Sequence, residues 1–313
     1  MDKQKLRILR SLFGNYRKVG EEFLFSCPFC KHHKPKLSVN LDKGAKCWVC
    51  GWATPNLYRL VRKFGNFEQR QEWKSFTNEI DINTFSEDLF GDLQEEPAPQ
   101  TVDLPREFVS LANKNLPITS AMARSYLRSR GVTREDILRW KIGYCPSGEY
   151  KERVVVPSFN GDGYSNYFIA RSYGREWPKY KNPPTARDII FNELYIDWDQ
   201  DLVIVEGVFD AIVAGPNAVP LLGSTIRESS KLFQEIVRHD TPIYVALDVD
   251  AEKKAMRLVR LLLQYDMEVY KVDISDHGAT DVGEMSKEEF MQIKSGTPAI
   301  NNDSYLLHKA TAI

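Results

Sequence analysis

Apolar and polar residues follow a regular order along the last third of the chain. Four short apolar runs have the length of buried strands, and they lie at 202–205, 218–221, 243–247 and 268–272. Three segments between them carry apolar residues at helical spacing, at 208–214, 226–238 and 252–265. This alternation of strand and helix predicts a parallel sheet covered by helices, which is an α/β fold.

The pattern between residues 105 and 200 is different. Residues 120–130 have apolar positions at helical spacing, and Thr133 with Asp136 forms the signature of a capping box before a second, short helix. The turn sequence N-G-D-G at 160–163 indicates a hairpin. Its two strands are predicted at 153–159 and 164–171. We therefore expect a separate α+β subdomain in this part of the chain.

Four of the five cysteines form two C-x2-C pairs separated by sixteen residues, and they are Cys27, Cys30, Cys47 and Cys50. Two such pairs can place four thiolates around one tetrahedral Zn2+. Two disulfide bonds are the alternative, but they are unexpected in a cytosolic chain. His32 and His33 lie near the first pair and are expected at the surface, and Cys145 is expected to be a buried thiol. The spacing predicts one structural zinc ion in a small β module, a zinc ribbon.

Lysines and aromatic residues are interspersed around these cysteines. We expect Lys36, Lys46 and Trp48 to contact single-stranded nucleic acid, because lysines bind phosphates and aromatic rings stack on bases. The alternative is a solvated lysine face over an aromatic mini-core.

The net charge is -1, and its distribution is more informative than its sum. Residues 76–104 contain many acidic residues and no Lys or Arg, which indicates an acidic flexible linker and leaves the rest of the chain with a basic balance. No apolar run approaches the roughly 18 residues that a membrane span needs, and the N-terminus has no signal-peptide pattern. We expect no membrane partner and a cytoplasmic location, or the host cytoplasm for a viral protein.

Acidic residues follow the predicted strands. Glu206 closes the first strand and is followed by Asp210; Asp248 and Asp250 close the third; Asp281 comes after the fourth. In parallel sheets, functional groups collect at the carboxyl ends of the strands. Clustered carboxylates repel one another unless a cation neutralises them, and oxygen ligands favour Mg2+ or Mn2+. The pattern predicts a metal site, whereas an isolated Asp-x-Asp is more often an exposed turn.

The ordered motifs resemble the Toprim domain that DnaG-like primases share with type IA and II topoisomerases and some nucleases. They are E-G-V-F-D at 206–210, L-G-S-T at 222–225, D-V-D at 248–250 and D-V-G-E at 281–284. The preceding block resembles the basic N-terminal subdomain of the primase core, in R-V-V-V-P at 153–157, A-R at 170–171, P-K-Y-K-N-P at 178–183 and F-N-E-L-Y at 191–195. Together with the four cysteines, these motifs are similar to a compact, phage-like DnaG-type primase over residues 20–55 and 105–290.

The resemblance implies a role for each matching residue. The catalytic, metal-binding carboxylates are Glu206, Asp248 and Asp250, supported by Asp210 and Asp281. The basic residues that hold the template or the nucleotide triphosphate are Arg153, Arg171, Lys179 and Lys181. One position departs from the family, because many primases have Asp-Pro-Asp where this chain has D-V-G, and Glu284 is left as a candidate replacement.

The implied activity is the synthesis of short RNA primers on single-stranded DNA by metal-dependent nucleotidyl transfer. It requires two or more Mg2+ or Mn2+ ions, ribonucleoside triphosphates and a template. A replicative helicase is expected on a separate chain, since this sequence has no P-loop. The alternatives are a Toprim nuclease or topoisomerase, a recombination mediator, and a non-catalytic zinc and Toprim module that binds single-stranded DNA. The expected segments are a zinc ribbon at 1–75, a linker at 76–104, a basic subdomain at 105–200, a Toprim domain at 201–295 and a tail at 296–313.

Overall fold

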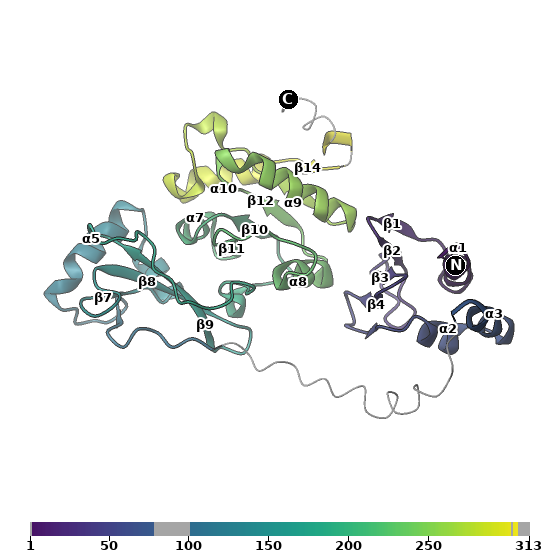
Figure 1. The fold of residues 1–313 in the computed structure, drawn as a ribbon. Helices are drawn as coiled ribbons and strands as arrows, with labels where there is room; N and C mark the ends of the chain where they lie inside the picture. The colour runs from purple at the N-terminus through teal and green to yellow at the C-terminus, as the bar shows by residue number, and fades with distance from the viewer. Residues whose placement is uncertain (1, 78–100, 302, 306–313) are drawn as a thin grey trace. The chain divides into compact units, whose positions relative to one another are not determined.

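The computed structural model describes residues 2–77, 101–301 and 303–305 (Figure 1). The chain divides into two units, Met1–Ala98 and Pro99–Ile313. The predicted linker falls mostly within residues 78–100, which lie outside the described residues, as do residues 306–313 of the predicted tail. No helix in the described ranges is both long and apolar enough to cross a membrane.

The first unit is built on an antiparallel sheet of five strands in sequential order. Its strands are β1 (Arg17–Val19), β2 (Glu22–Phe25), β3 (Leu37–Asn40), β4 (Gly44–Cys47) and β5 (Ala53–Thr54). Its helices are α1 (Asp2–Phe13), α2 (Tyr58–Phe64) and α3 (Phe67–Thr77). Leu9, Phe25, Leu37, Val61 and Trp73 are buried in one core that the sheet and the helices share.

The second unit begins with a four-stranded antiparallel sheet in the order β6-β7-β8-β9. The strands are β6 (Val109–Ser110), β7 (Gly143–Cys145), β8 (Arg153–Phe159) and β9 (Ser165–Ser172). The accompanying helices are α5 (Ala121–Ser129) and α6 (Arg134–Arg139). The predicted hairpin is confirmed as β8 and β9, and the predicted capping box is confirmed, because the Thr133 hydroxyl accepts a hydrogen bond from the Asp136 amide while the Asp136 carboxylate accepts one from the Thr133 amide.

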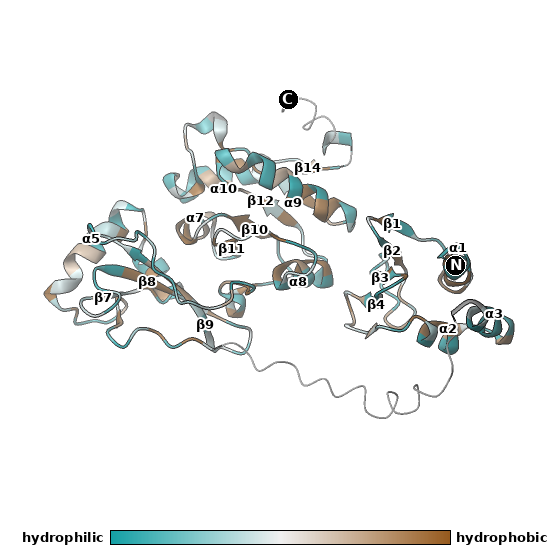
Figure 2. Ribbon diagram, viewed as in Figure 1, coloured by the Kyte–Doolittle hydropathy of each residue, from teal (hydrophilic) through white to brown (hydrophobic). Residues whose placement is uncertain are grey.

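The predicted parallel sheet is confirmed, with strand order β11-β10-β12-β13-β14 and an antiparallel edge strand. The strands are β10 (Leu202–Val205), β11 (Ala218–Pro220), β12 (Ile243–Val245), β13 (Val269–Lys271) and β14 (Ala299–Ile300). The helices are α7 (Val208–Ala214), α8 (Lys231–His239), α9 (Glu252–Gln264) and α10 (Lys287–Gly296). All residues of α7 are buried, and Figure 2 shows hydrophobic colouring on α7 and on β10 beside it. One hydrophobic cluster includes residues of both sheets of this unit, among them Val154, Tyr167, Val205 and Ile212.

Helix α8 begins at Lys231 rather than at the predicted residue 226. The chain turns sharply after β11, because Leu222 and Gly223 both have left-handed backbone conformations, with φ of 54° and 77°. Residues 222–230 therefore form a loop at the carboxyl end of the sheet, where the acidic residues also lie.

Candidate functional site

The four cysteines of the first unit come together. Their sulfurs all lie within 4.8 Å of one another, with 3.9 Å between Cys27 and Cys50 and 3.8 Å between Cys30 and Cys47. A tetrahedron with metal–sulfur bonds of about 2.3 Å has edges of about 3.8 Å, so the spacing fits one zinc ion. All four are free thiols, which removes the disulfide alternative in this structure. Burial raises the pKa of the Cys27 and Cys47 thiols.

The predicted nucleic-acid contacts of this unit have different environments. The Lys46 ammonium lies 4.8 Å from the centroid of the Trp48 ring, and both side chains are half-buried. Lys36, in contrast, is buried, with only 1% of its surface exposed. The Lys36 side chain is therefore enclosed by the unit instead of facing solvent, and its predicted contact with phosphates stays a prediction. His33 is exposed as expected and His32 is half-buried, and neither belongs to the four-sulfur group.

In the second unit, acidic side chains from separate segments face one cavity of about 460 Å³. Glu206 follows β10 and Asp248 follows β12, and these strands are parallel neighbours. Asp210 comes from α7 and Asp281 from the turn before Val282–Glu284, and both also line the cavity. Asp250 does not line it, since this side chain is exposed on the turn that leads into α9. The sheet therefore gathers four of the five predicted carboxylates.

Asp210 is tied into the protein by backbone donors. Its carboxylate accepts hydrogen bonds from the Gly207 amide at 2.8 Å, at the start of α7, and from the Gly283 amide at 3.0 Å. Burial and the nearby Asp281 charge raise the pKa of Asp210 to about 6, against the lowering effect of these amides. Asp210 thus joins α7 to the 281–284 turn, while it adds negative charge to the cavity.

Gly283 occupies the position where the family motif has its further carboxylate. A β-carbon at this position would lie 2.6 Å from Oδ1 of Asp210, so any side chain there would displace that hydrogen bond. Glu284 does not take over the missing role, because its carboxylate accepts hydrogen bonds from the amide and hydroxyl of Thr280 and does not line the cavity. The hydrogen bond from the Gly283 amide to the Asp210 carboxylate therefore depends on the absence of a side chain at 283.

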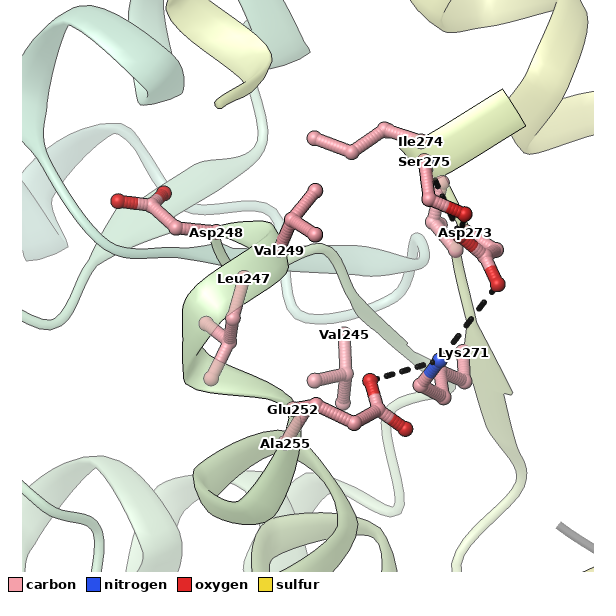
Figure 3. Close-up of a pocket in the computed structure, with 11 residues that line it drawn as sticks. Val245, Leu247, Asp248, Val249, Glu252, Ala255, Lys271, Asp273, Ile274 and Ser275 are labelled. Atoms are coloured by element: carbon pink, nitrogen blue, oxygen red, sulfur yellow. Dashed lines mark hydrogen bonds and ion pairs between the residues drawn. The ribbon is translucent and has the colours of Figure 1, made fainter. Parts of the chain in front are cut away.

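Asp248 has a higher pKa than Asp210. Burial, followed by the charges of Asp210, Glu206 and Asp281, raises the pKa of Asp248 to about 7. Figure 3 shows that Asp248 points away from the neighbouring pocket, in which Lys271 is paired with Glu252 at 3.0 Å and lies 3.9 Å from Asp273. Lys271 therefore does not neutralise Asp248.

One cation that the sequence pattern did not reveal lies at the acidic cluster. The Lys254 ammonium donates to both oxygens of Glu206, at 2.9 and 3.1 Å, and the two side chains are only 24% and 20% exposed. Lys254 lies in the first turn of α9, four residues after Asp250. Its position after the Asp-x-Asp sequence is the only signal that could have indicated it.

The cavity also has a basic wall. Arg130, Arg171, Lys179 and Arg187 line it together with the acidic residues. Arg171 is buried against the rings of Tyr180 and Phe209, whereas Lys179 is exposed. Arg130 and Arg187 were not predicted from the sequence, because isolated arginines outside a motif carry no positional signal.

The other two predicted basic residues do not line this cavity. The Arg153 guanidinium is buried and donates to the carbonyl oxygens of Lys151 and Pro178, which gives it a structural role beside β8. Lys181 pairs with Glu149 at 3.0 Å.

The donor set of the cavity fits a divalent cation. Oδ1 of Asp248 and Oδ1 of Asp281 are buried and have no hydrogen-bond partner among the described residues. Buried carboxylate oxygens without partners are costly, and a cation would satisfy them. Across the described ranges, these carboxylates do not place three oxygens within 4.8 Å of one another, and Glu206 is held by Lys254. The residues that would hold the ion are therefore Asp248 and Asp281, with Glu206 available once Lys254 releases it.

Comparison with known proteins gives a consistent family. No protein-family model matches the sequence. The DNA primase of Thermotoga maritima is 23% identical in an alignment that covers 85% of this chain and 55% of that protein. The DNA primase of Aquifex aeolicus is 25% identical in an alignment that covers 90% of this chain and 65% of that protein. The crystal structure of the zinc-binding and RNA polymerase domains of the Aquifex aeolicus primase aligns with 95% of this chain and 84% of its own, at 19% identity and a TM-score of 0.45.

The sequence matches extend over most of this chain, and the chain spans only 55% and 65% of the length of the two relatives. These relatives carry the name of the family that the ordered motifs of this sequence resemble. By sequence, the chain is therefore similar to bacterial DNA primases, the proteins that its ordered motifs resemble.

Proposed function

We propose that the protein is a DNA primase that joins ribonucleotides on a single-stranded DNA template. The observation that carries this proposal is the pair of partnerless carboxylate oxygens of Asp248 and Asp281, which share one cavity with Arg171 and Lys179. A cation site beside a basic wall is the arrangement that nucleotidyl transfer requires, because the reaction brings a polyphosphate to an attacking hydroxyl.

The side chains of this cavity have different proposed roles. Glu206, Asp248 and Asp281 would hold Mg2+ or Mn2+, while Asp210 keeps α7 and the 281–284 turn in place. When bound, such ions lower the pKa of the attacking 3′-hydroxyl and neutralise charge on the pyrophosphate that leaves. Arg171 and Lys179 orient the phosphates of the template or of the incoming nucleotide. Asp250, which the sequence resemblance assigned as the third catalytic carboxylate, is exposed and outside the cavity, and this proposal places Asp281 in the metal site instead.

The first unit supplies a zinc-stabilised module for the template. One zinc ion on the four cysteines would fix the end of β4 and the turn after it, which carry Lys46 and Trp48, a cation and a ring suited to phosphate contact and base stacking. The predicted segments, namely the linker at 76–104, the basic subdomain at 105–200 and the Toprim domain at 201–295, are part of this proposal. A replicative helicase on a separate chain is the proposed partner.

The test is primer synthesis by the full chain with single-stranded DNA, labelled ribonucleotides and Mg2+. Short RNA products that disappear in Asp248→Ala, while template binding persists, are the expected result. Matched control Asp266→Ala removes an acidic residue that does not line the cavity, and it should leave synthesis unchanged. Cleaved DNA without RNA would indicate a nuclease, and binding without either product would indicate a non-catalytic module.

A further inference from the structure

A second cavity, of about 410 Å³, adjoins the candidate active site. Arg187 and Leu222 line both cavities, so the two spaces meet at these side chains. The second cavity runs along the 222–230 loop between β11 and α8, and away from the carboxylates. We call it the loop groove.

The loop groove begins directly beside Glu206. The amide of Leu221 donates to the carbonyl of Val205 at 2.8 Å, and the amide of Leu222 donates to the carbonyl of Glu206 at 3.1 Å. The left-handed turn at Leu222 and Gly223 then leads the chain away from the sheet. The start of the groove is therefore fixed to the same strand end that carries the catalytic carboxylate.

Two arginines without neutralising partners line the groove. Arg187 and Arg227 are both exposed, and within the described part of the chain neither guanidinium makes an ion pair or a hydrogen bond. The backbone around Arg227 is held by Ser230, whose hydroxyl donates to the Arg227 carbonyl at 2.6 Å. Asp188 is the acidic residue of the lining, and its carboxylate accepts a hydrogen bond from the Lys231 amide at 3.0 Å. The groove therefore has an excess of positive charge.

The rest of the groove lining contains both hydroxyl-bearing and apolar side chains. Ser224, Thr225 and Ser229 bring hydroxyl groups, while Ile189 and Ile226 bring apolar surface. A sugar–phosphate chain presents the complementary sequence of groups, because its anionic phosphates alternate with less polar sugars and bases. A bare triphosphate would leave the apolar part of the lining without a partner.

We propose that the loop groove binds the backbone phosphates of a single-stranded nucleic acid as the strand passes out of the candidate active site. Arg187 and Arg227 each contact a phosphate through the planar guanidinium, which can donate two parallel hydrogen bonds to phosphate oxygens. The loop hydroxyls add neutral donors, as they commonly do at nucleic-acid backbones. This inference deepens the proposed function and rests on it for the identity of the strand.

The test measures binding of fluorescently labelled oligothymidylate to the full chain at 0.05 to 0.2 M salt, without Mg2+ so that no reaction occurs. Each phosphate contact contributes about 0.7 to the slope of log affinity against log salt for single strands. The double variant Arg187→Ala, Arg227→Ala should therefore reduce the slope by about 1.4. Arg260→Ala is the matched control, since Arg260 is exposed on α9 and lines neither cavity, and it should keep the wild-type slope.

A double variant with the wild-type slope, or a control with the same loss, would overturn the proposal. Titration with labelled ATP separates the two sources of phosphate, because loss of ATP affinity with an unchanged oligonucleotide slope would assign the groove to a triphosphate and also overturn it. Primer synthesis is a separate readout. A changed slope in a protein that makes no primers would refute the proposed function and leave the groove assignment standing.

Discussion

Lys254 forms an ion pair with Glu206, one of the carboxylates that the proposed metal site needs. Replacing Lys254 tests whether a cation must displace it in order to bind. Its ammonium donates to both oxygens of Glu206, and less than a quarter of either side chain is exposed. Lys254→Met keeps the length and apolar part of the side chain but removes the charge. The change leaves Glu206 half-buried and without a cation, next to the negative charge of Asp248.

The magnitude follows from the strength of a charge-assisted hydrogen bond. Such bonds contribute about 1.5–3 kcal/mol, and partial exposure places this pair near the lower part of that range, at about 2 kcal/mol. If a divalent cation must displace Lys254 from Glu206, removing the lysine removes that cost. A difference of about 2 kcal/mol corresponds to roughly 30-fold tighter cation binding. The cation-free variant should be less stable than the wild type, because its buried charge has lost its partner.

The assay is thermal unfolding at increasing Mg2+ or Mn2+ concentration, since a ligand that binds only the folded state raises Tm once its concentration exceeds its Kd. The expected result for Lys254→Met is a lower Tm in EDTA and a rise in Tm that begins at a lower cation concentration. Lys253→Met is the control, because Lys253 is exposed on the same turn and does not line the acidic cavity. If the rise in Tm began at the same cation concentration in both variants, or at a higher concentration in Lys254→Met, a cation would not displace Lys254 from Glu206. Lys254 would then be a residue that positions Glu206.

Three further predictions concern the other parts of the two sites. Cys47→Ser should abolish the binding of about one zinc per chain and lower the Tm of the first unit, whereas Cys145→Ser should keep the zinc; metal analysis of the purified proteins decides this. Gly283→Asp should lower Tm and fail to add a metal ligand, because its β-carbon would lie 2.6 Å from Asp210; an unchanged Tm with tighter Mn2+ binding would contradict this account. The folded-state pKa values of Asp210 and Asp248, about 6 and 7, lie above the ordinary value of 3.8, so these two groups stabilise the cation-free protein at acidic pH, and it should lose this stability as pH rises from about 4 to 7. Asp248→Asn should flatten this profile in EDTA, and a Tm of the wild type that does not change over this range would count against the buried, uncompensated cluster.

The sequence was sufficient for the features that depend on local periodicity and spacing. The strands of the parallel sheet, the hairpin of β8 and β9 and the capping box of Thr133 all arise from neighbouring residues, and all were predicted. The four cysteines were predicted to meet because two C-x2-C pairs have few other stable arrangements. The late start of α8 was missed, because the left-handed turn at Leu222 depends on a non-glycine residue that sequence patterns do not associate with such a turn.

The spacing of residues in the sequence did not predict which side chains would be buried and which exposed. Lys36 follows the same lysine-rich pattern as Lys46, yet the fold buries the first and leaves the second beside Trp48. Asp250 lies two residues from Asp248 but faces solvent, because Val249–Ala251 form a 3-10 turn, in which side chains two positions apart point in different directions. A charge pattern predicts which residues are available for a site, and the backbone direction at each position decides which of them enter it.

Gly283 shows how a departure from a family motif can be explained by a contact elsewhere in the chain. In the sequence alone, D-V-G at 281–283 lacks the second carboxylate of the Asp-Pro-Asp motif. In the folded protein, the Gly283 amide donates to Asp210, and the same bond holds α7 against the turn that carries Asp281. A carboxylate side chain at 283 would break this bond, and it would place another charge beside two acids whose pKa values are already raised. The chain therefore keeps the geometry of Asp281 at the expense of one ligand, and this is why the proposed metal site depends on Asp248, Asp281 and the release of Glu206 by Lys254.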